Sequence, residues 1–314
     1  MTPISQLSSA WDPAPLVLAS ALVAFVRFGQ AFLRLRRRGR ADHAGWDRPV
    51  LFAAGLGLVT LPLVSPLDAA GDEYLLSAHM LEHVLLGDAG PALLLLAVRG
   101  PLLVFMVPAS VARLVTRNAG LYRLLGWSTR PLAALGIWAS SIAVWHVPAL
   151  FDSALRHPAV HDLEHATFLT AGFLVWAQLI DPAQRERLSL VQRVGLAGTV
   201  YVLGQILSAV LFLVPTPLYP AYAAQPARLF GLSALQDQQL AGLVMMGEQL
   251  LTLGTCVAIL LVASVRESAR DVRPARGPDE QLRTSRRPRP GRAATPASWP
   301  GTLASREPTR QPGS

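Results

Sequence analysis

The chain contains no lysine and only one cysteine, Cys256, and charged residues make up just 15% of its 314 positions. A single thiol excludes a disulfide within the chain. So little charge, together with a hydrophobic share of 52%, excludes an ordinary soluble domain. No phosphate-binding glycine loop, dinucleotide fingerprint or nucleophile paired with a base is evident, so the sequence does not indicate an enzyme.

What the chain has instead is long apolar segments. A helix needs about 20 apolar residues to cross the hydrocarbon core of a membrane. Seven segments qualify, namely 14–33, 50–66, 75–97, 131–149, 162–180, 194–214 and 240–264. We therefore predict an all-α, polytopic integral membrane bundle of about seven transmembrane helices. We expect the first segment to stay attached and not to act as a signal peptide, because its arginines follow it instead of preceding it.

The positive side chains predict the orientation of this bundle, and all 28 of them are arginines. Six, five and three arginines fall in three alternate loops, 34–49, 98–130 and 181–193. None, one and one fall in the loops between them, 67–74, 150–161 and 215–239. Because arginine-rich loops face the cytoplasm, we predict the amino terminus outside and the carboxyl terminus in the cytoplasm. The net charge of +8 then reflects topology, and we expect no nucleic-acid partner.

Two segments fall outside the predicted spans. Residues 101–125 begin apolar and then carry three arginines among valine, leucine and tyrosine, a pattern typical of an amphipathic helix on the cytoplasmic face. From Arg266 onward, proline, arginine, serine, threonine and glycine dominate, so we expect residues 266–314 to form a disordered cytoplasmic tail. The membrane domain would then comprise residues 1–265.

Five of the seven histidines lie where the predicted spans reach the outer face. His79 and His83 are at the start of the third span, His161 and His165 are at the start of the fifth, and His146 is near the end of the fourth. A spacing of four residues places both imidazoles of a pair on one helix face, about 5–6 Å apart at Cβ, which suits binding of one ion. The pattern therefore predicts one metal site made of all five histidines.

A plainer interpretation competes with this one. A single histidine near a membrane interface is usually an interfacial residue with one hydrogen bond, and one His-x-x-x-His pair occurs often by chance. Two pairs and a fifth histidine on one side favour a metal, because ionisable residues within spans are costly and usually face a partner. Neutral imidazole suits copper, zinc, nickel and iron. We interpret Met80, Met245 and Met246 as packing residues and Cys256 as a buried, inert thiol.

Polar residues near the histidines are candidates for supporting roles. Glu82 and Glu164 each precede a histidine by one residue, and Asp88 lies deeper in its span. Three roles are open for these carboxylates: to orient the imidazoles, to bind the ion directly, or to be ordinary interfacial carboxylates in water. Asp237, Gln238 and Gln239 open the last predicted span from the outer side. For Asp237, a helix cap and a contribution to the site are both open. The two glutamines can instead hydrogen-bond across the bundle.

These motifs resemble a known family. The strings HMLEHVLL, WHVPALFDSALRHPAVHDLEHATFLTAG and DQQLAGLVM occur in the order typical of the CtaG family of cytochrome c oxidase assembly proteins, and the resemblance covers most of residues 14–264. It implies a multi-pass protein of the bacterial plasma membrane that is tied to copper-dependent maturation of the oxidase. It assigns the family's histidine positions to the five histidines above and its later polar motif to residues 237–239. Glu82 stands where the family often has a neutral polar residue, which leaves its role open.

One expectation and two alternatives follow. As the resemblance implies, we expect an assembly factor that binds copper at an outward-facing histidine site, with cytochrome c oxidase subunits and the lipid bilayer as its partners. The first alternative is a haem protein that carries electrons, since His83 with His146 or His165 could ligate one iron from facing helices. The pairing of histidines within single helices favours a compact ion over a macrocycle. The second alternative is a metal-free assembly scaffold.

Overall fold

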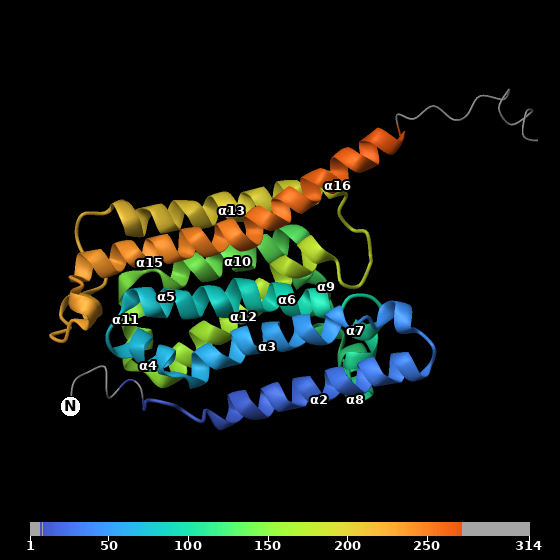
Figure 1. Cartoon of the computed structure of the whole chain (residues 1–314), viewed down its shortest axis with the longest axis horizontal. Coiled ribbons are helices and arrows are strands. Elements are labelled where there is room, and N and C mark those ends of the chain that lie inside the picture. Colours follow the sequence, from blue (N-terminus) through green and yellow to red (C-terminus); the bar gives the residue numbers. More distant parts are fainter. Residues whose placement is uncertain (1–6, 8, 272–314) are drawn as a thin grey trace, which may run out of the picture. The chain divides into compact units, whose positions relative to one another are not determined.

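The computed structural model describes residue 7 and residues 9–271, and within this part the chain forms helices and no strand (Figure 1). This confirms the predicted all-α class. The first half of the chain contains α2 (Pro15–Arg37), α3 (Asp47–Val64), α4 (Pro66–Glu73), α5 (Leu76–Val84), α6 (Gly90–Ala97), α7 (Pro101–Met106), α8 (Ala109–Arg117) and α9 (Ala119–Ser128). The second half contains α10 (Pro131–Trp145), α11 (Pro148–Arg156), α12 (Pro158–Ile180), α13 (Leu190–Leu213), α14 (Pro220–Ala223), α15 (Ala234–Gln249) and α16 (Thr255–Asp271).

Short 3₁₀ and π segments complete the described chain. The 3₁₀ turns are η1 (Ala41–His43) and η3 (Leu229–Gly231). The π turns are η2 (Leu85–Ala89), which joins α5 to α6, and η4 (Leu250–Gly254), which joins α15 to α16. Each π turn therefore lies inside a long, otherwise continuous helix. Single π turns of this kind occur often at functional sites.

Within the described residues, six helical stretches are long and apolar enough to cross a membrane, and a bent helix pair makes a seventh if it forms one span. The six are Pro15–Arg37, Ala41–Val64, Leu76–Ala97, Pro158–Ile180, Leu190–Leu213 and Ala234–Glu267. This agrees with the predicted number of about seven. The departure is the fourth span, predicted at 131–149, because α10 ends at Trp145 and α11 continues at an angle of 77°. Val147 is extended and Pro148 opens α11, which is the backbone that a residue before proline prefers.

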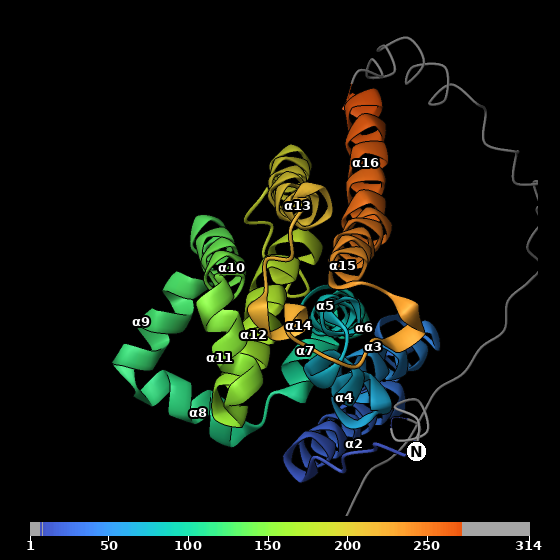
Figure 2. The same ribbon diagram turned by 90° about the vertical axis from the view of Figure 1, so that its left-hand side faces the viewer.

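The ends of the bundle differ in their short helices (Figures 1 and 2). The long helices run side by side, with α5 and α6 forming one central rod, and α8 and α9 lie across one end. At the other end lie α4, α11 and α14, which face the viewer in Figure 2. The starts of α5, α12 and α15 also lie at this second end. Every histidine predicted as a ligand therefore belongs to the end that α4, α11 and α14 cover.

The arginine-rich loops gather at the opposite end. The Arg27 guanidinium donates hydrogen bonds to the Met106 carbonyl, and Arg48 donates to the carbonyls of Leu96 and Ala97. The Gly100 amide donates to Pro182 across the bundle. The arginine-rich loops and the five candidate histidines thus lie at two different ends of the bundle. Which end faces the cytoplasm stays a prediction.

The segment 101–125 differs from the single amphipathic helix that we predicted. It forms α7, α8 and the first part of α9, because Pro108 interrupts the helix after α7 and Asn118 caps the start of α9 through its side chain. None of the three is long enough to be a candidate span. At the carboxyl end, α16 continues to Asp271, six residues into the expected tail. The rest of that tail, residues 272–314, lies outside the described residues.

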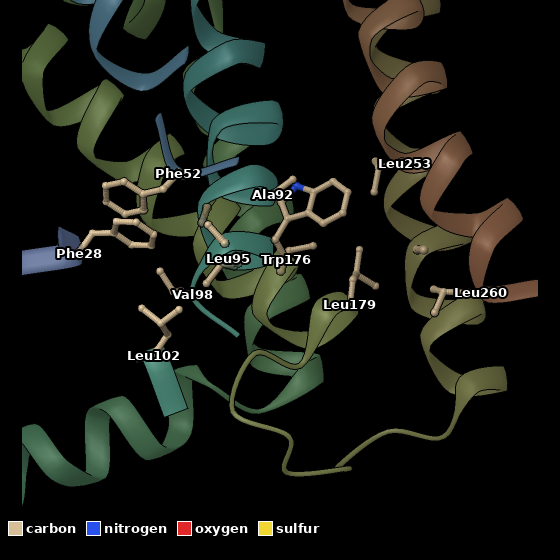
Figure 3. Close-up of a cluster of buried hydrophobic side chains, with 14 of the residues drawn as sticks. Phe28, Phe52, Ala92, Leu95, Val98, Leu102, Trp176, Leu179, Leu253 and Leu260 are labelled. Atoms are coloured by element: carbon tan, nitrogen blue, oxygen red, sulfur yellow. The ribbon is translucent and has the colours of Figure 1, made fainter. Parts of the chain in front are cut away.

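An apolar core holds the arginine-rich half of the bundle together (Figure 3). Phe28 of α2 stacks on Phe52 of α3 with ring centroids 4.1 Å apart, and Leu95 of α6 lies in the same buried cluster. Trp176 of α12 and Leu253 of η4 extend the cluster toward the last span. Burial of this apolar surface stabilises helix contacts that require no polar groups. Most of the buried polar side chains lie in the other half of the bundle.

A glycine permits one unusually close helix contact near the middle of the bundle. A Cβ placed on Gly172 of α12 would lie 2.0 Å from the Gly87 carbonyl oxygen of η2. No side chain fits in that space, so the backbone of α12 packs directly against the π turn. The contact fixes α12 next to α5, and these two helices carry most of the candidate site.

Candidate metal centre

Helices α5 and α12 each begin with the same five-residue pattern, His-x-x-Glu-His. In both, the histidines are four residues apart and the glutamate precedes the second one, so all three side chains lie on one face of the helix. The two patterns comprise His79, Glu82 and His83 on α5, and His161, Glu164 and His165 on α12. We call these six residues the histidine–carboxylate cluster. All six are buried.

The four imidazoles of the cluster lie in contact with one another. Within each helix the ring centroids are 4.2 Å apart for His79 and His83, and 4.1 Å apart for His161 and His165. Between the helices, His79 is 5.3 Å from His161, and His83 is 5.3 Å from His165. The structure therefore brings together four of the five histidines that the sequence singled out.

The two glutamates cross between the helices. The Glu82 Oε1 atom of α5 lies 3.7 Å from the His165 Nε2 atom of α12. In return, the Glu164 Oε1 atom of α12 lies 3.8 Å from the His83 Nε2 atom of α5. Both carboxyl groups have no exposed surface. Each helix thus places a carboxylate oxygen beside a histidine of the other helix, and neither half is complete alone.

A third carboxylate, Asp72 of α4, completes the surroundings. Its Oδ1 atom lies 3.5 Å from both His79 Nδ1 and His161 Nε2. The backbone of α4 approaches closely because a Cβ on Gly71 would lie 3.0 Å from the Cα of His79. Sequence reasoning missed Asp72. The signal was available, since Asp68 and Asp72 are four residues apart and immediately precede the helix that carries His79.

The buried donor atoms of the cluster lack hydrogen-bond partners in the described part of the chain. This holds for both ring nitrogens of His79 and His83 and for both carboxylate oxygens of Glu82 and Glu164. Buried polar atoms are almost always hydrogen-bonded in folded proteins. A group of unpaired nitrogens and oxygens that converge on one point is the arrangement expected of a cation site. The donor chemistry, imidazole with carboxylate, suits a transition metal.

The spacing of these atoms also fits a single ion. His79, His83, His161 and Glu164 each offer one donor atom, and these four atoms lie within 4.8 Å of one another. Ligands at bond lengths of about 2.0–2.2 Å are separated by up to about 4 Å. A shift of less than about 1 Å at the side-chain ends would therefore close the site around a metal.

An acidic cavity leads to the cluster. It has a volume of about 440 Å³, and its walls include His161 and His165 together with Asp68, Asp72 and Asp162. Burial, and next the neighbouring Asp72 carboxylate, raise the pKa of Asp68 to about 7. A cavity lined by one sign of charge concentrates counter-ions. The acidic cavity next to the cluster thus favours cations.

His146 lies apart from the other four histidines. It follows the last residue of α10, and the ring of Phe168 is in contact with both His83 and His146, at 4.7 and 6.4 Å between centroids. His146 is not among the residues whose donor atoms converge in the cluster, so its part in a five-histidine site stays a prediction.

Comparison with known proteins identifies the chain's relatives. The family model of the cytochrome c oxidase caa3 assembly factors, Caa3_CtaG, matches residues 26–267. The chain belongs to this family. The match confirms the resemblance that the motifs indicated, and it includes every residue of the histidine–carboxylate cluster. No curated protein and no solved structure matches the chain.

In this caa3 assembly factor, Asp237 caps a helix other than its own. Its carboxylate accepts hydrogen bonds from the Leu76 amide at 2.7 Å, the Ser77 amide at 3.1 Å and the Ser77 hydroxyl at 2.6 Å. These amides are the first of α5, the helix that carries His79 and His83. Ser233 caps the helix of Asp237 itself, so Asp237 instead holds the start of the helix that carries His79 and His83, and its support of the site stays a prediction.

The neighbouring glutamines of the assembly factor have separate roles. The buried Gln238 side chain accepts from the Leu218 amide and donates to the carbonyls of Leu211 and Thr216, so it fixes the loop after α13. Gln239 is half-buried. Neither side chain is among the groups that converge in the histidine–carboxylate cluster. Their predicted support of the site stays a prediction.

Proposed function

We propose that this caa3 assembly factor binds copper in the histidine–carboxylate cluster and supplies it for maturation of the copper centres of cytochrome c oxidase. The observation that carries the proposal is the pair of crossed His-x-x-Glu-His patterns, whose buried donor atoms converge without hydrogen-bond partners. Family membership supports the assembly role. The assignment of copper rests on the donor chemistry together with that role.

Copper fits the donor set for two reasons. Among divalent first-row metals, copper binds a given nitrogen and oxygen site most tightly, and imidazole is one of its common ligands. Glu82, Glu164 and Asp72 surround the same space and would offset the charge of a divalent ion that is held away from water. A divalent ion within a membrane protein is tolerated only when nearby groups of opposite charge, here the carboxylates, balance it.

The location of the cluster supports delivery from the outer side of a bacterial plasma membrane. It lies at the end of the bundle opposite the arginine-rich loops, which the positive-inside rule assigns to the cytoplasm. The acidic cavity next to it gives an ion a route in and out. We infer that the protein holds copper and hands it on without catalysing a reaction, with oxidase subunits and the lipid bilayer as its partners.

The experiment is a double substitution with a matched control. His79→Ala with His83→Ala should leave the protein in the membrane but lower both the copper bound by the purified protein and the oxidase activity of the cells. His43→Ala with His157→Ala removes the same number of histidines from outside the cluster and should change neither. Copper is measured by mass spectrometry after loading in detergent. Unchanged copper stoichiometry in the first variant would refute the assignment.

The same preparation separates the two alternatives. Imidazole rings packed 4.1–5.3 Å apart suit a compact ion and leave little room for a macrocycle between them. A Soret band together with iron would nevertheless establish the haem protein. A protein that carries no metal after loading, and whose histidine variants still support the oxidase, would be a scaffold.

A further inference from the structure

A second, smaller cavity lies deeper in the bundle than the histidine–carboxylate cluster. Its volume is about 50 Å³, and its walls include Met80, His83, Asp88, His146, Phe168 and Met245. Four helices contribute, α5 with its π turn, α10, α12 and α15. A cavity needs only about 10–15 Å³ to hold one water, so this one accommodates a metal ion. Its lining differs from that of the cluster, because it includes two methionines.

His146 is prepared to bind a metal in this cavity. Its Nδ1 atom lies 2.9 Å from the Ile142 carbonyl oxygen, which can only accept a hydrogen bond. Nδ1 must therefore carry the proton, and in the neutral ring Nε2 has the free lone pair. That Nε2 atom is buried and has no partner among the described residues. A histidine that donates one N–H to a backbone carbonyl and keeps the other nitrogen free is typical of metal ligands.

Met80 and Met245 also line this cavity. Their exposed fractions are 0% and 5%, and both belong to one packed cluster at the boundary between α5 and α15. Met246, the neighbour of Met245, does not line the cavity. Thioether with imidazole is a softer donor set than imidazole with carboxylate, and it selects Cu(I) among biological metals. The sequence suggested packing for these methionines, but it could not show that they share a cavity with His146.

One acidic residue, Asp88, lines the cavity. Asp88 lies in the π turn η2, and its carboxyl accepts hydrogen bonds from Trp176 Nε1 and Thr252 Oγ1. The carboxyl of Glu248, beside the π turn η4, is buried next to Asp88. A monovalent cation held away from water needs such a counter-charge. Among the described residues, no arginine forms an ion pair with either carboxyl.

We propose that this inner cavity is a second metal site, selective for Cu(I), in which His146, Met80 and Met245 are the ligands and Asp88 balances the charge. His83 lies between the two sites, since it belongs to the cluster and also lines the cavity. The inference extends the proposed copper function. It assigns to the protein a soft inner site beside a harder outer one.

The test uses the full-length protein in detergent, loaded with Cu(I) without oxygen and then freed of loosely bound metal. Met80→Leu with Met245→Leu keeps side-chain volume, a change that cores usually tolerate. It should remove one copper per chain and abolish copper–sulfur scattering in the X-ray absorption spectrum. Met246→Leu is the matched control and should retain both. His146→Gln should also lose the inner copper while keeping both thioethers.

A cluster variant separates this inference from the proposed function. In His79→Ala with His161→Ala, the sulfur-ligated copper should remain while the other copper is lost. Wild-type protein that binds copper without sulfur scattering would overturn the inner site and leave the outer one standing. Equal loss in Met246→Leu and in the double leucine variant would overturn it as well. Wild-type protein that binds no copper would overturn both proposals.

Discussion

Removal of the Asp237 carboxylate tests how α5 is held in place. The side chain is 3% exposed and accepts three hydrogen bonds at the first residues of α5, from Leu76 and Ser77. Asp237→Ala would leave two backbone amides without a partner in a buried position. Because these amides begin the helix that carries His79, the variant should lose stability and copper together.

The magnitude follows from the hydrogen bonds. Each bond to a charged acceptor contributes about 1.5–3 kcal/mol. The three share one carboxylate and are not additive, so we expect a loss of about 3–5 kcal/mol. On the scaling of globular domains, that lowers the melting temperature by on the order of 10 °C. Asp237→Asn keeps one oxygen acceptor and should lose about half as much.

Thermal unfolding of the metal-free protein in detergent gives the first measurement, and copper stoichiometry gives the second. Gln239→Ala is the control, because Gln239 is two residues away on the same helix and only half-buried. Its free energy of unfolding should stay within about 0.5 kcal/mol of the wild-type value. If Asp237→Ala and Gln239→Ala melt at the same temperature, the carboxylate does not hold α5 and the reasoning fails.

Two further predictions concern packing and protonation. Gly172→Ala should destabilise the bundle, because its Cβ would lie 2.0 Å from the Gly87 carbonyl oxygen. Gly198→Ala is the control and should not destabilise it, because the space around Gly198 is open. Equal melting temperatures of the two variants would contradict the close contact. The pKa of Asp68 is raised to about 7 by burial and next by Asp72, whereas the unfolded chain releases this proton at about pH 4. The folded state binds the extra proton between these values, so stability should fall as pH rises from about 4 to about 7. Asp68→Asn should flatten the melting temperature over that range, and a profile that keeps the wild-type slope would contradict the shift.

Much of the fold could be predicted because membrane spans follow from length and hydrophobicity alone. The segments at 14–33 and 194–214 correspond to Pro15–Arg37 and Leu190–Leu213. The break after Trp145 could not be predicted, since a proline such as Pro148 is tolerated within spans and also at helix starts. Whether it bends the chain depends on what packs against it.

Part of the candidate site could likewise be predicted from the sequence, and part could not. Four-residue spacing predicted correctly that His79 shares a helix face with His83, because that relation lies within one helix. Which way α10 turns His146 depends on packing against Phe168, and a single-helix pattern carries no such information. Asp237 meets the start of α5 from 160 residues away, so its role as a cap for another helix was equally hidden.

The π turns η2 and η4 have a consequence for the length of two spans. A π turn accommodates one residue more than an α turn, and each residue rotates a helix by about 100°. In α5–η2–α6, the extra residue therefore rotates the ligand-bearing half, α5, about the helix axis relative to α6, the half that is anchored in the apolar core. Deletion of Gly87 would regularise the helix but turn His79 and His83 away from α12 while the anchored half stayed in place. The number of residues between the histidines and the apolar core is therefore fixed by the π turn.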